Sequence, residues 1–344
     1  MIKKKIKEIL YKSRSNIHKD LKLHLMSNEK RDLNYNIKSF GDMNSDKIFY
    51  VIQRFKGGGM FSNINYILHH LYICENFGCI PIIDFENYPT KYNEPSKINS
   101  SSNMWDYYFE PINKYKLEEI YKSKFVIITS NKTNRIKEFD TFENLTPKHY
   151  DLFIKYFKMK KNIFQEIRNF EKKYFLNKKI LGVHFRGTDM KTQERHPLPP
   201  TIYQIVSLID KKIKEDKYNL IYLVTEDINY HKKLKAKYKN FLCSYSSYRS
   251  TNSDIFNNYE RENHRYMIGK ENLIDMHLLS KTDGIICSES HIPDAAKFVN
   301  YNRPNFKLFK IDNGFNSENI IYAKFLWHVK KILPEFLGGF KKNF

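Results

Sequence analysis

Short apolar runs alternate with amphipathic stretches along the chain. The run at 48–54 is rich in β-branched and aromatic residues and predicts a strand, and apolar residues then recur at helical spacing over 62–77. The run CIPIID, 79–84, predicts the next strand. Together these segments predict one βαβ unit.

The second half of the chain repeats this alternation more regularly. A buried strand that ends in a polar cluster is predicted within 178–190, and a strand, an acidic turn and a helix within 218–238. The other predicted elements are a strand at 283–290 and helices at 201–216, 271–282 and 291–300. Alternating strands and helices imply a parallel sheet, so we expect a doubly wound fold in each half. Ligands of such sheets lie beyond the carboxyl ends of the strands.

These patterns predict four segments. They are a basic leader over 1–45, an N-terminal α/β domain over 46–176, a C-terminal Rossmann-like domain over 177–315 and a helical tail over 316–344. The aromatic stretch from Phe85 to Phe109 has no clear periodicity and is long for a connection, which suggests a functional loop.

Composition adds a charge constraint. The 344 residues, 41% hydrophobic and 15% aromatic, can bury a substantial core, and 59 basic against 38 acidic residues give a net charge of +21. Such a charge favours polyanionic partners, namely nucleic acid, an anionic membrane or phosphorylated substrates. The alternative explanation is an AT-rich genome, which raises the content of Lys, Asn and Ile, so the charge alone identifies no partner.

The cysteines and the termini bear on the compartment. Cys74, Cys79, Cys243 and Cys287 are scattered and form no CxxC, which indicates neither a disulfide framework nor a zinc site and favours a reduced, cytoplasmic compartment. No apolar run is long enough to span a membrane, and the start lacks a secretory apolar region. The leader reads as a basic amphipathic helix, which either lies on an anionic bilayer or is a packed or frayed helix.

The stretch QRFKGGGMFSN joins the first predicted strand to its helix. A glycine loop in this context favours anion binding at a helix N-terminus. The pattern is neither GxGxxG nor GxxxxGK[ST], and glycines also serve plain tight turns. Both interpretations stay open at this stage.

The cluster GVHFRGTDMKTQERHP follows a predicted buried strand. Arg186 is well placed for a phosphate, because its planar fork binds oxyanions bidentately. Asp189 could orient it and Gly187 would let a ligand approach; the alternative is an ordinary strand-end salt bridge. Glu194 lies in a loop stiffened by two prolines, where a carboxylate is commonly just solvated.

Two further clusters and one buried acid complete the set. Glu226 and Asp227 in LVTED could bind ribose, an arginine or a metal with a diphosphate, or could cap the next helix. Ser288 and Ser290 in CSESHI form a turn whose amides could receive a phosphate, or act as caps. Asp275 lies among apolar residues, so it needs a donor from the protein or from a ligand.

The sequence lacks the motifs of several other classes of protein. The sequence contains no Ser-His-Asp elbow, Walker loop or zinc constellation, and no RNA-binding signature, which makes nucleic acid an unlikely partner.

The three clusters, in this order, resemble the motifs of a fucosyltransferase superfamily. It includes the α-1,6-fucosyltransferases of N-glycan cores, the nodulation-factor fucosyltransferases and, more distantly, the protein O-fucosyltransferases. Their motifs run GVHxRRTDK, ATDD and LDIHFLSxADxxVCTFSS, and the matching stretches are GVHFRGTDM, VTED and IDMHLLSKTDGIICSES. The third match is the most specific. The resemblance covers about residues 48–300 and is strong from 180 onward.

The resemblance implies a GT-B-like pair of Rossmann-type domains with a cleft between them, and an inverting transfer from a GDP-sugar without a metal or other cofactor. By position, Arg186 would bind the β-phosphate and stabilise the departing GDP. Asp275 would accept hydrogen bonds from the guanine edge, assisted by the backbone of His184. The remaining donor-side positions are Asp189, Glu226, Asp227, Ser288, Ser290 and His291.

The resemblance also assigns an acceptor side. Glu194, ten residues after His184, would be the general base on the acceptor hydroxyl. Lys56 would lie close to that base, lower its pKa and relay its proton across the cleft. Gly57, Gly58 and Gly59 would keep the cleft wall thin. Trp105 and Tyr107 would contact the acceptor, or else belong to the core.

Four positions depart from the motifs. Gly187 and Ala295 stand where the family has arginines, Met190 where it has lysine and Glu226 where it has Asp. The donor site is less positive, so the sugar stays open: fucose by default, or a GDP-activated heptose or mannose derivative. The expected acceptor is a bacterial surface glycan, and the expected location is the cytoplasm or the inner face of its membrane. The alternative class is a non-catalytic basic protein that binds nucleotides, RNA or membrane.

Overall fold

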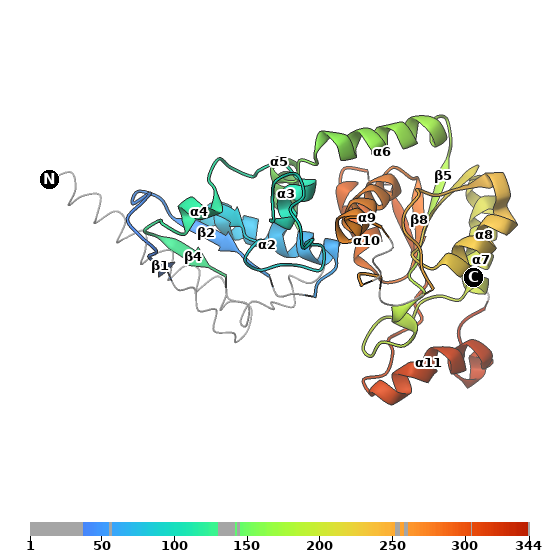
Figure 1. Ribbon diagram of the computed structural model, residues 1–344. Helices are drawn as coiled ribbons and strands as arrows, with labels where there is room; N and C mark the ends of the chain where they lie inside the picture. Colours follow the sequence, from blue (N-terminus) through green and yellow to red (C-terminus); the bar gives the residue numbers. More distant parts are fainter. Residues whose placement is uncertain are drawn as a thin grey trace. The chain divides into compact units, whose positions relative to one another are not determined.

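The computed structural model describes residues 37–54, 57–129, 142, 145–251, 255–257, 261–303 and 305–342. The chain forms two compact units, Met1–Lys160 and Lys161–Phe344, and each is described by itself (Figure 1). Both are α/β units built on largely parallel sheets, as the sequence predicts.

The first unit contains a four-stranded sheet. Its order is β1 (Ile37–Lys38), β4 (Val126–Ile128), β2 (Phe49–Ile52) and β3 (Ile80–Ile83), and its helices are α2 (Met60–Phe77), α3 (Met104–Tyr108), α4 (Leu117–Ile120) and α5 (Pro147–Tyr156). Strands β3, β2 and β4 are parallel, whereas β1 is antiparallel to β4. All four residues of β2 are buried, as expected for a central strand of a parallel sheet. The predicted βαβ unit is therefore present as β2, α2 and β3.

The second unit contains a five-stranded parallel sheet. Its order is β7 (Leu242–Cys243), β6 (Leu220–Val224), β5 (Ile180–His184), β8 (Gly284–Cys287) and β9 (Lys307–Lys310). Its helices are α6 (Lys161–Tyr174), α7 (Ile202–Asp216), α8 (Ile228–Tyr238), α9 (His264–Ser280), α10 (His291–Val299) and α11 (Ile320–Ile332), with 3₁₀ turns at Asp189–Lys191, Lys239–Phe241 and Glu335–Leu337. The connections run outward in both directions from β5 and β8, so the unit is doubly wound.

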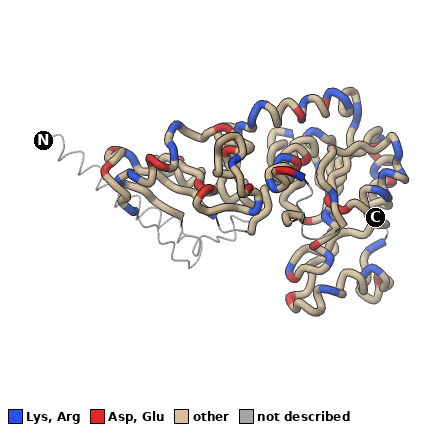
Figure 2. The backbone as a smooth tube through the Cα atoms, viewed as in Figure 1, with Lys and Arg blue, Asp and Glu red and all other residues tan. Residues whose placement is uncertain are grey.

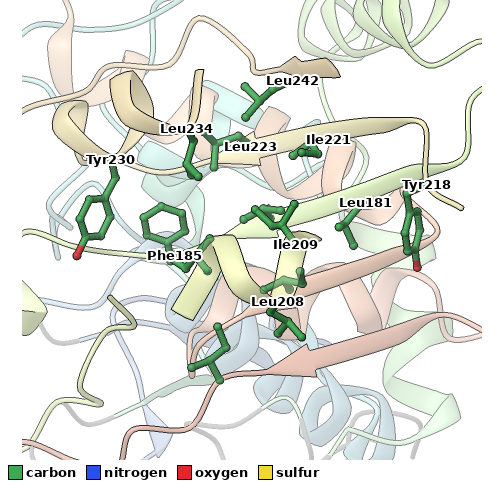
Figure 3. Close-up of a cluster of buried hydrophobic side chains, with 14 residues drawn as sticks. Leu181, Phe185, Leu208, Ile209, Tyr218, Ile221, Leu223, Tyr230, Leu234 and Leu242 are labelled. Carbon is green, nitrogen blue, oxygen red and sulfur yellow. The ribbon is translucent and has the colours of Figure 1, made fainter. Parts of the chain in front are cut away.

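Helices cover both faces of this sheet. Leu181 and Val183 of β5 pack with residues of α7 and α8 in one buried apolar cluster (Figure 3). Gly182 points to the opposite face, where a Cβ atom would lie 3.0 Å from Leu279 of α9. Because side chains alternate along a strand, His184 lies on the face of Gly182, beneath α9. Glycine at 182 is thus required by close packing of helix and strand.

The predicted boundary at residues 176 and 177 is wrong by one helix. Contacts divide the chain after Lys160, and α6 belongs to the second unit. The reason is that α6 buries Ile163, Ile167 and Phe170 and packs on α9, with Lys270 of α9 paired to Glu166. The predicted leader, 1–45, also includes residues 37–38, which form β1 and pair with β4 in the first unit.

Candidate functional site

The three sequence clusters meet at one edge of the second sheet. His184 at the end of β5 is the register partner of Val224 in β6 and of Cys287 in β8. The loops that follow these strands therefore leave from the same edge. Strand order reverses between β5 and β8, and this reversal is the place where doubly wound sheets bind their ligands.

Arg186 is fixed at this edge by two carboxylates. Its Nη2 donates to both oxygens of Asp189, at 2.9 and 2.7 Å, as the sequence suggests, and its Nε lies 3.8 Å from Glu226. About a third of the Arg186 side chain remains exposed. The guanidinium is therefore oriented by the protein and still accessible to an anionic ligand.

Glu226 supports the loop that carries Arg186. Its Oε1 accepts from the amide of Gly187 at 3.0 Å and from the hydroxyl of Thr188 at 3.3 Å. Burial raises the pKa of this carboxyl, and the neighbouring Arg186 opposes that rise. Glu226 thus holds the loop in its conformation and partly offsets the positive charge of Arg186.

Asp227 has a different task. It caps α8, because its Oδ1 accepts from the amides of Asn229 and Tyr230, and its Oδ2 pairs with Lys191 at 3.2 Å. The capping alternative from the sequence is therefore correct for Asp227. A Cβ atom at Gly187 would lie 2.7 Å from Oδ2 of Asp227, so this position has no room for a larger side chain.

Two buried polar atoms at this edge lack partners within the described part of the chain. They are Nδ1 of His184 and Oγ of Ser288, in residues that are each 2% exposed. Burial, assisted by the charge of Arg186, lowers the pKa of His184 to about 3, so its imidazole is neutral. Buried polar groups are normally paired, and an orphaned one indicates a missing ligand or water.

The N-terminus of α10 opens at the same edge. Ser290 is its N-cap residue and makes no side-chain capping bond, and His291 is the first residue of the helix. Uncapped amides at a helix N-terminus attract anions. The expected phosphate-side positions Ser288, Ser290 and His291 therefore do follow β8 in one turn.

Asp275 finds its donors within the protein. Its Oδ1 accepts from the hydroxyl of Tyr222 and its Oδ2 from the hydroxyl of Ser247, each at 2.6 Å. Burial raises the pKa of Asp275 to about 6, and both hydroxyls and Arg249 oppose that rise. Each carboxylate oxygen has a second lone pair, so a ligand donor can still be accepted.

The segment around Asp275 was not anticipated from the sequence. Arg249 donates to the carbonyls of Ser247 and Tyr245, at 2.9 and 2.8 Å, which folds residues 245–249 into a compact turn. Glu271 of α9 accepts from the amide of Tyr248 at 2.9 Å. The only sequence signal was the dense polar run SYSSYRS after a very short strand.

The loop that carries Glu194 is held by the C-terminal tail. Asn316, 4% exposed, donates from Nδ2 to the carbonyl of Gln193 at 3.1 Å and to that of Ala323 in α11 at 3.0 Å. Arg195 adopts a positive φ of 59° beside these bonds. The carboxylate of Glu194 makes no hydrogen bond or ion pair with the residues that the structure describes. It is partly exposed and therefore available to a substrate.

An apolar contact closes the same loop. Leu198, Trp327 and Phe340 form a buried cluster, and Nε1 of Trp327 donates to the carbonyl of Pro199 at 2.7 Å. Lys191 lies over the Trp327 ring at 5.1 Å. The predicted helical tail is thus part of the second unit and fixes the loop of the expected base.

The glycine run of the first unit makes a tight entry to α2. Gly57 has a φ of 143°, which favours glycine, and Gly59 is the N-cap residue. A Cβ atom at Gly58 would lie 2.7 Å from Oδ1 of Asn63. Gly57 is therefore favoured by its backbone conformation, and Gly58 lies close to the ends of the Asn63 and Arg54 side chains.

The anion-binding interpretation of that run gains no support. The amide of Met60, the first residue of α2, already donates to the hydroxyl of Tyr92 at 2.8 Å. Lys56 lies outside the described residues, so its predicted proximity to Glu194 stays a prediction.

Trp105 and Tyr107 are core residues, which corrects their interpretation as acceptor contacts. They are 3% and 0% exposed. The Trp105 ring stacks on Phe109, with centroids 4.5 Å apart, and its Nε1 donates to the carbonyl of Glu110. Sugar stacking requires an open aromatic face, and these faces are covered by the protein.

Comparisons with known proteins agree with this arrangement at the level of the fold. No protein-family model and no curated protein matches the chain. The structure is similar to that of NodZ α-1,6-fucosyltransferase co-crystallised with GDP, with 15% identity, a TM-score of 0.50 and coverage of 73% of this chain and 92% of that chain.

Two more distant structures complete the comparison. A variant of Arabidopsis thaliana FUT1 in complex with GDP is 13% identical, with a TM-score of 0.44 over 77% of this chain and 71% of that chain. POFUT1 in complex with GDP is 11% identical, with a TM-score of 0.42 over 76% of this chain and 98% of that chain.

The second unit is thus a doubly wound domain, with an oriented arginine and unpaired buried polar atoms at its switch point. The chain shares its fold with NodZ α-1,6-fucosyltransferase. The resemblance predicted from the three motifs is confirmed at this level.

Proposed function

We propose that the protein is a glycosyltransferase that moves a sugar, fucose in the first instance, from a GDP-sugar to a hydroxyl of a bacterial surface glycan. The observation that carries the proposal is the pair of orphaned buried atoms, Nδ1 of His184 and Oγ of Ser288, beside the oriented Arg186. A bound nucleotide diphosphate would supply the partners that these atoms lack. NodZ, whose fold the chain shares, was co-crystallised with GDP.

In this proposal the donor lies across the edge of the second sheet. Arg186 binds the diphosphate with its exposed fork, and the α10 amides stabilise the charge that develops as GDP leaves. Asp275 accepts from the guanine edge with its free lone pairs, while Tyr222 and Ser247 hold the carboxylate in place. Each of these groups acts on leaving-group charge or on base recognition.

The proposed reaction inverts the anomeric carbon and uses no metal. Glu194 takes the proton from the acceptor hydroxyl, while GDP departs from the opposite face of the sugar. Glu226 and Asp227 already serve Gly187 and the N-terminus of α8. Among the described residues, no group of three or more His, Cys, Asp or Glu side chains could hold a metal ion.

The arrangement of the two units belongs to the proposal as well. We expect a GT-B-like pair with the acceptor between them, Lys56 beside Glu194, and Gly57, Gly58 and Gly59 along the cleft wall. We also expect the enzyme to work in the cytoplasm or on the inner face of its membrane, with the basic leader as one contact to anionic lipid.

Two other functions are alternatives to the proposed fucosyl transfer. Another GDP-activated sugar, such as a heptose or mannose derivative, would use the same nucleotide contacts. A non-catalytic basic protein that binds RNA is favoured only by the net charge of +21. Product analysis after incubation with GDP-sugars and candidate glycans separates the sugars.

Nucleotide selectivity tests the donor assignment. GDP is expected to raise the melting temperature by several degrees, because a ligand at about one hundred times its Kd stabilises the fold by about 2.7 kcal/mol. UDP and CMP are expected to have little effect, since they lack the guanine edge. A thermal-shift panel measures this, and stabilisation by UDP or CMP without GDP would refute the proposed donor.

Asp275→Asn is expected to increase the free energy of unfolding and to weaken GDP binding. Raising a carboxyl pKa from 3.8 to about 6 disfavours the folded, ionised form by about 3 kcal/mol. This free-energy cost is absent below pH 3.8, the ordinary pKa of the carboxyl. It grows as the pH rises from 3.8 to about 6 and is complete above that pH. The variant should therefore unfold at higher denaturant concentration than the wild type at pH 8, yet bind GDP at least about tenfold more weakly.

Denaturant titrations at pH 4 and pH 8 test the stability half of this prediction, and calorimetry with GDP tests the affinity half. The stability gain should be larger at pH 8. A variant that binds GDP like the wild type would remove Asp275 from base recognition.

A further inference from the structure

The outer face of α11 is apolar and exposed. Ile321, Phe325 and Ile332 leave 68%, 61% and 80% of their surface open, and Tyr322 and Val329 are exposed beside them. At 3.6 residues per turn these positions fall on one side of the helix. An apolar stripe normally faces a core, whereas this one faces solvent.

The exposed surface continues past the helix. Phe336 and Leu337 follow in the 3₁₀ turn and are 85% and 58% exposed. We call the whole surface the α11 patch; it consists of Ile320, Ile321, Tyr322, Phe325, Val329, Ile332, Phe336 and Leu337. Contiguous apolar surface of this kind marks an interaction site.

The helix is firmly attached by its other face. Ala323 and Trp327 are buried, and Trp327 donates to Pro199 and packs with Leu198 and Phe340. Asn319 caps the helix with bonds to the amides of the first turn. The patch is therefore presented in a fixed orientation at the margin of the second unit (Figure 1).

The charges around the patch are mostly positive (Figure 2). Helix α11 contains Lys324, Lys330 and Lys331 and no acidic residue, and Lys341 and Lys342 follow it. The acidic residues beside it are Glu318, before the helix, and Glu335, in the 3₁₀ turn. Apolar residues flanked by lysines complement an anionic lipid surface, where the side chains enter the interface and the amines meet headgroups. A second copy of the chain would instead bring two basic patches together.

The length of the helix fits a position on the membrane. Thirteen residues span only about 20 Å. No helix within the described residues is long and apolar enough to cross a bilayer. We propose that the α11 patch binds the surface of an anionic bilayer, with the helix lying in the plane of the interface.

Vesicle sedimentation of the full chain tests this proposal. Wild-type protein should pellet with phosphatidylcholine vesicles that contain about one quarter phosphatidylglycerol, and much less with phosphatidylcholine alone. The double variant Phe325→Ser, Ile332→Ser should bind the anionic vesicles at least about tenfold more weakly. The matched control Ile154→Ser, Leu176→Ser changes residues that are 57% and 68% exposed elsewhere, and should bind like the wild type.

A charge variant separates the two contributions. Lys324→Gln should weaken binding to anionic vesicles about fivefold, and added salt should reduce that difference. Melting temperatures close to the wild-type value would show that the variants fold.

Three outcomes would overturn the proposal. The first is that wild-type protein does not bind anionic vesicles. The second is that the Phe325→Ser, Ile332→Ser variant binds them as tightly as the wild type, which would assign binding to another basic surface such as the leader. The third is a wild-type dimer in sedimentation velocity that ignores vesicles and that this variant dissociates, which would make the patch a subunit interface.

Discussion

Replacing Glu194 by Gln is expected to lower turnover by about 10²- to 10⁴-fold and to leave GDP affinity within about twofold of the wild type. The amide has nearly the shape of the carboxylate but cannot take the proton of the acceptor hydroxyl. In the structure the Glu194 carboxylate makes no hydrogen bond or ion pair with any described residue, so its replacement breaks no contact within the described part of the chain. The variant should therefore fold normally.

The measurement is the rate of GDP release from GDP-fucose in the presence of the acceptor identified by product analysis, alongside GDP binding by calorimetry. Glu215→Gln is the matched control, because Glu215 is an exposed glutamate near the end of α7. Activity of the Glu194→Gln variant close to the wild type would remove this residue as the base. Loss of GDP binding would instead indicate that the loop itself had been disturbed.

The strands and helices of the second unit could be predicted because their sequence signals are strong. Every residue of β5 and β6 is buried, and both strands are apolar except for His184 at the end of β5. Helix α7 begins at Ile202, after the N-cap residue Thr201, which forms a capping box with Gln204. Strand β9 was missed, because KLFK is only four residues long and none of its residues is fully buried. The β-propensity of four residues is a weak signal, and this segment is a strand because it pairs with β8.

Some assignments depend on packing that a linear pattern does not contain. Aromatic residues stack on sugars and also fill cores, and only the burial of Trp105 and Tyr107 distinguishes these roles. The stripe of α6 could have packed on either unit, and contact with α9 decides it. Arg249 lies in a polar run without periodicity, so its bonds around Ser247 appear only in three dimensions.

The candidate site itself was predictable in part. The order of the motifs placed Arg186, Glu226 and Ser288 at the carboxyl ends of parallel strands, and the register of β5 with β6 and β8 brings those ends together. The role of the tail could not be foreseen, because Asn316 reaches Gln193 across more than one hundred residues of sequence. Long-range hydrogen bonds of this kind leave no periodic trace.

Arg186→Ala is expected to weaken GDP binding by about 10- to 100-fold and to lower turnover further, since a charge-assisted bond to phosphate contributes about 1.5–3 kcal/mol. Guanosine, which carries no phosphate, should bind this variant as tightly as it binds the wild type. Arg186→Lys should recover only part of the loss, because the amine keeps the charge but not the fork. Calorimetric titrations with GDP and guanosine provide the comparison, and equal losses for both ligands would contradict a phosphate role.

A second substitution separates binding from folding in that experiment. Removing Arg186 leaves the largely buried Glu226 carboxyl, whose side chain is 17% exposed, without its nearby cation, and burial already raises the pKa of Glu226. The single variant should therefore lose some stability at neutral pH, because an unpaired and largely buried charge is costly. Arg186→Ala combined with Glu226→Gln removes that charge and should regain stability, but GDP should still bind weakly. Recovery of GDP affinity in the double variant would mean that the arginine acts on the fold of the loop and not on the phosphate.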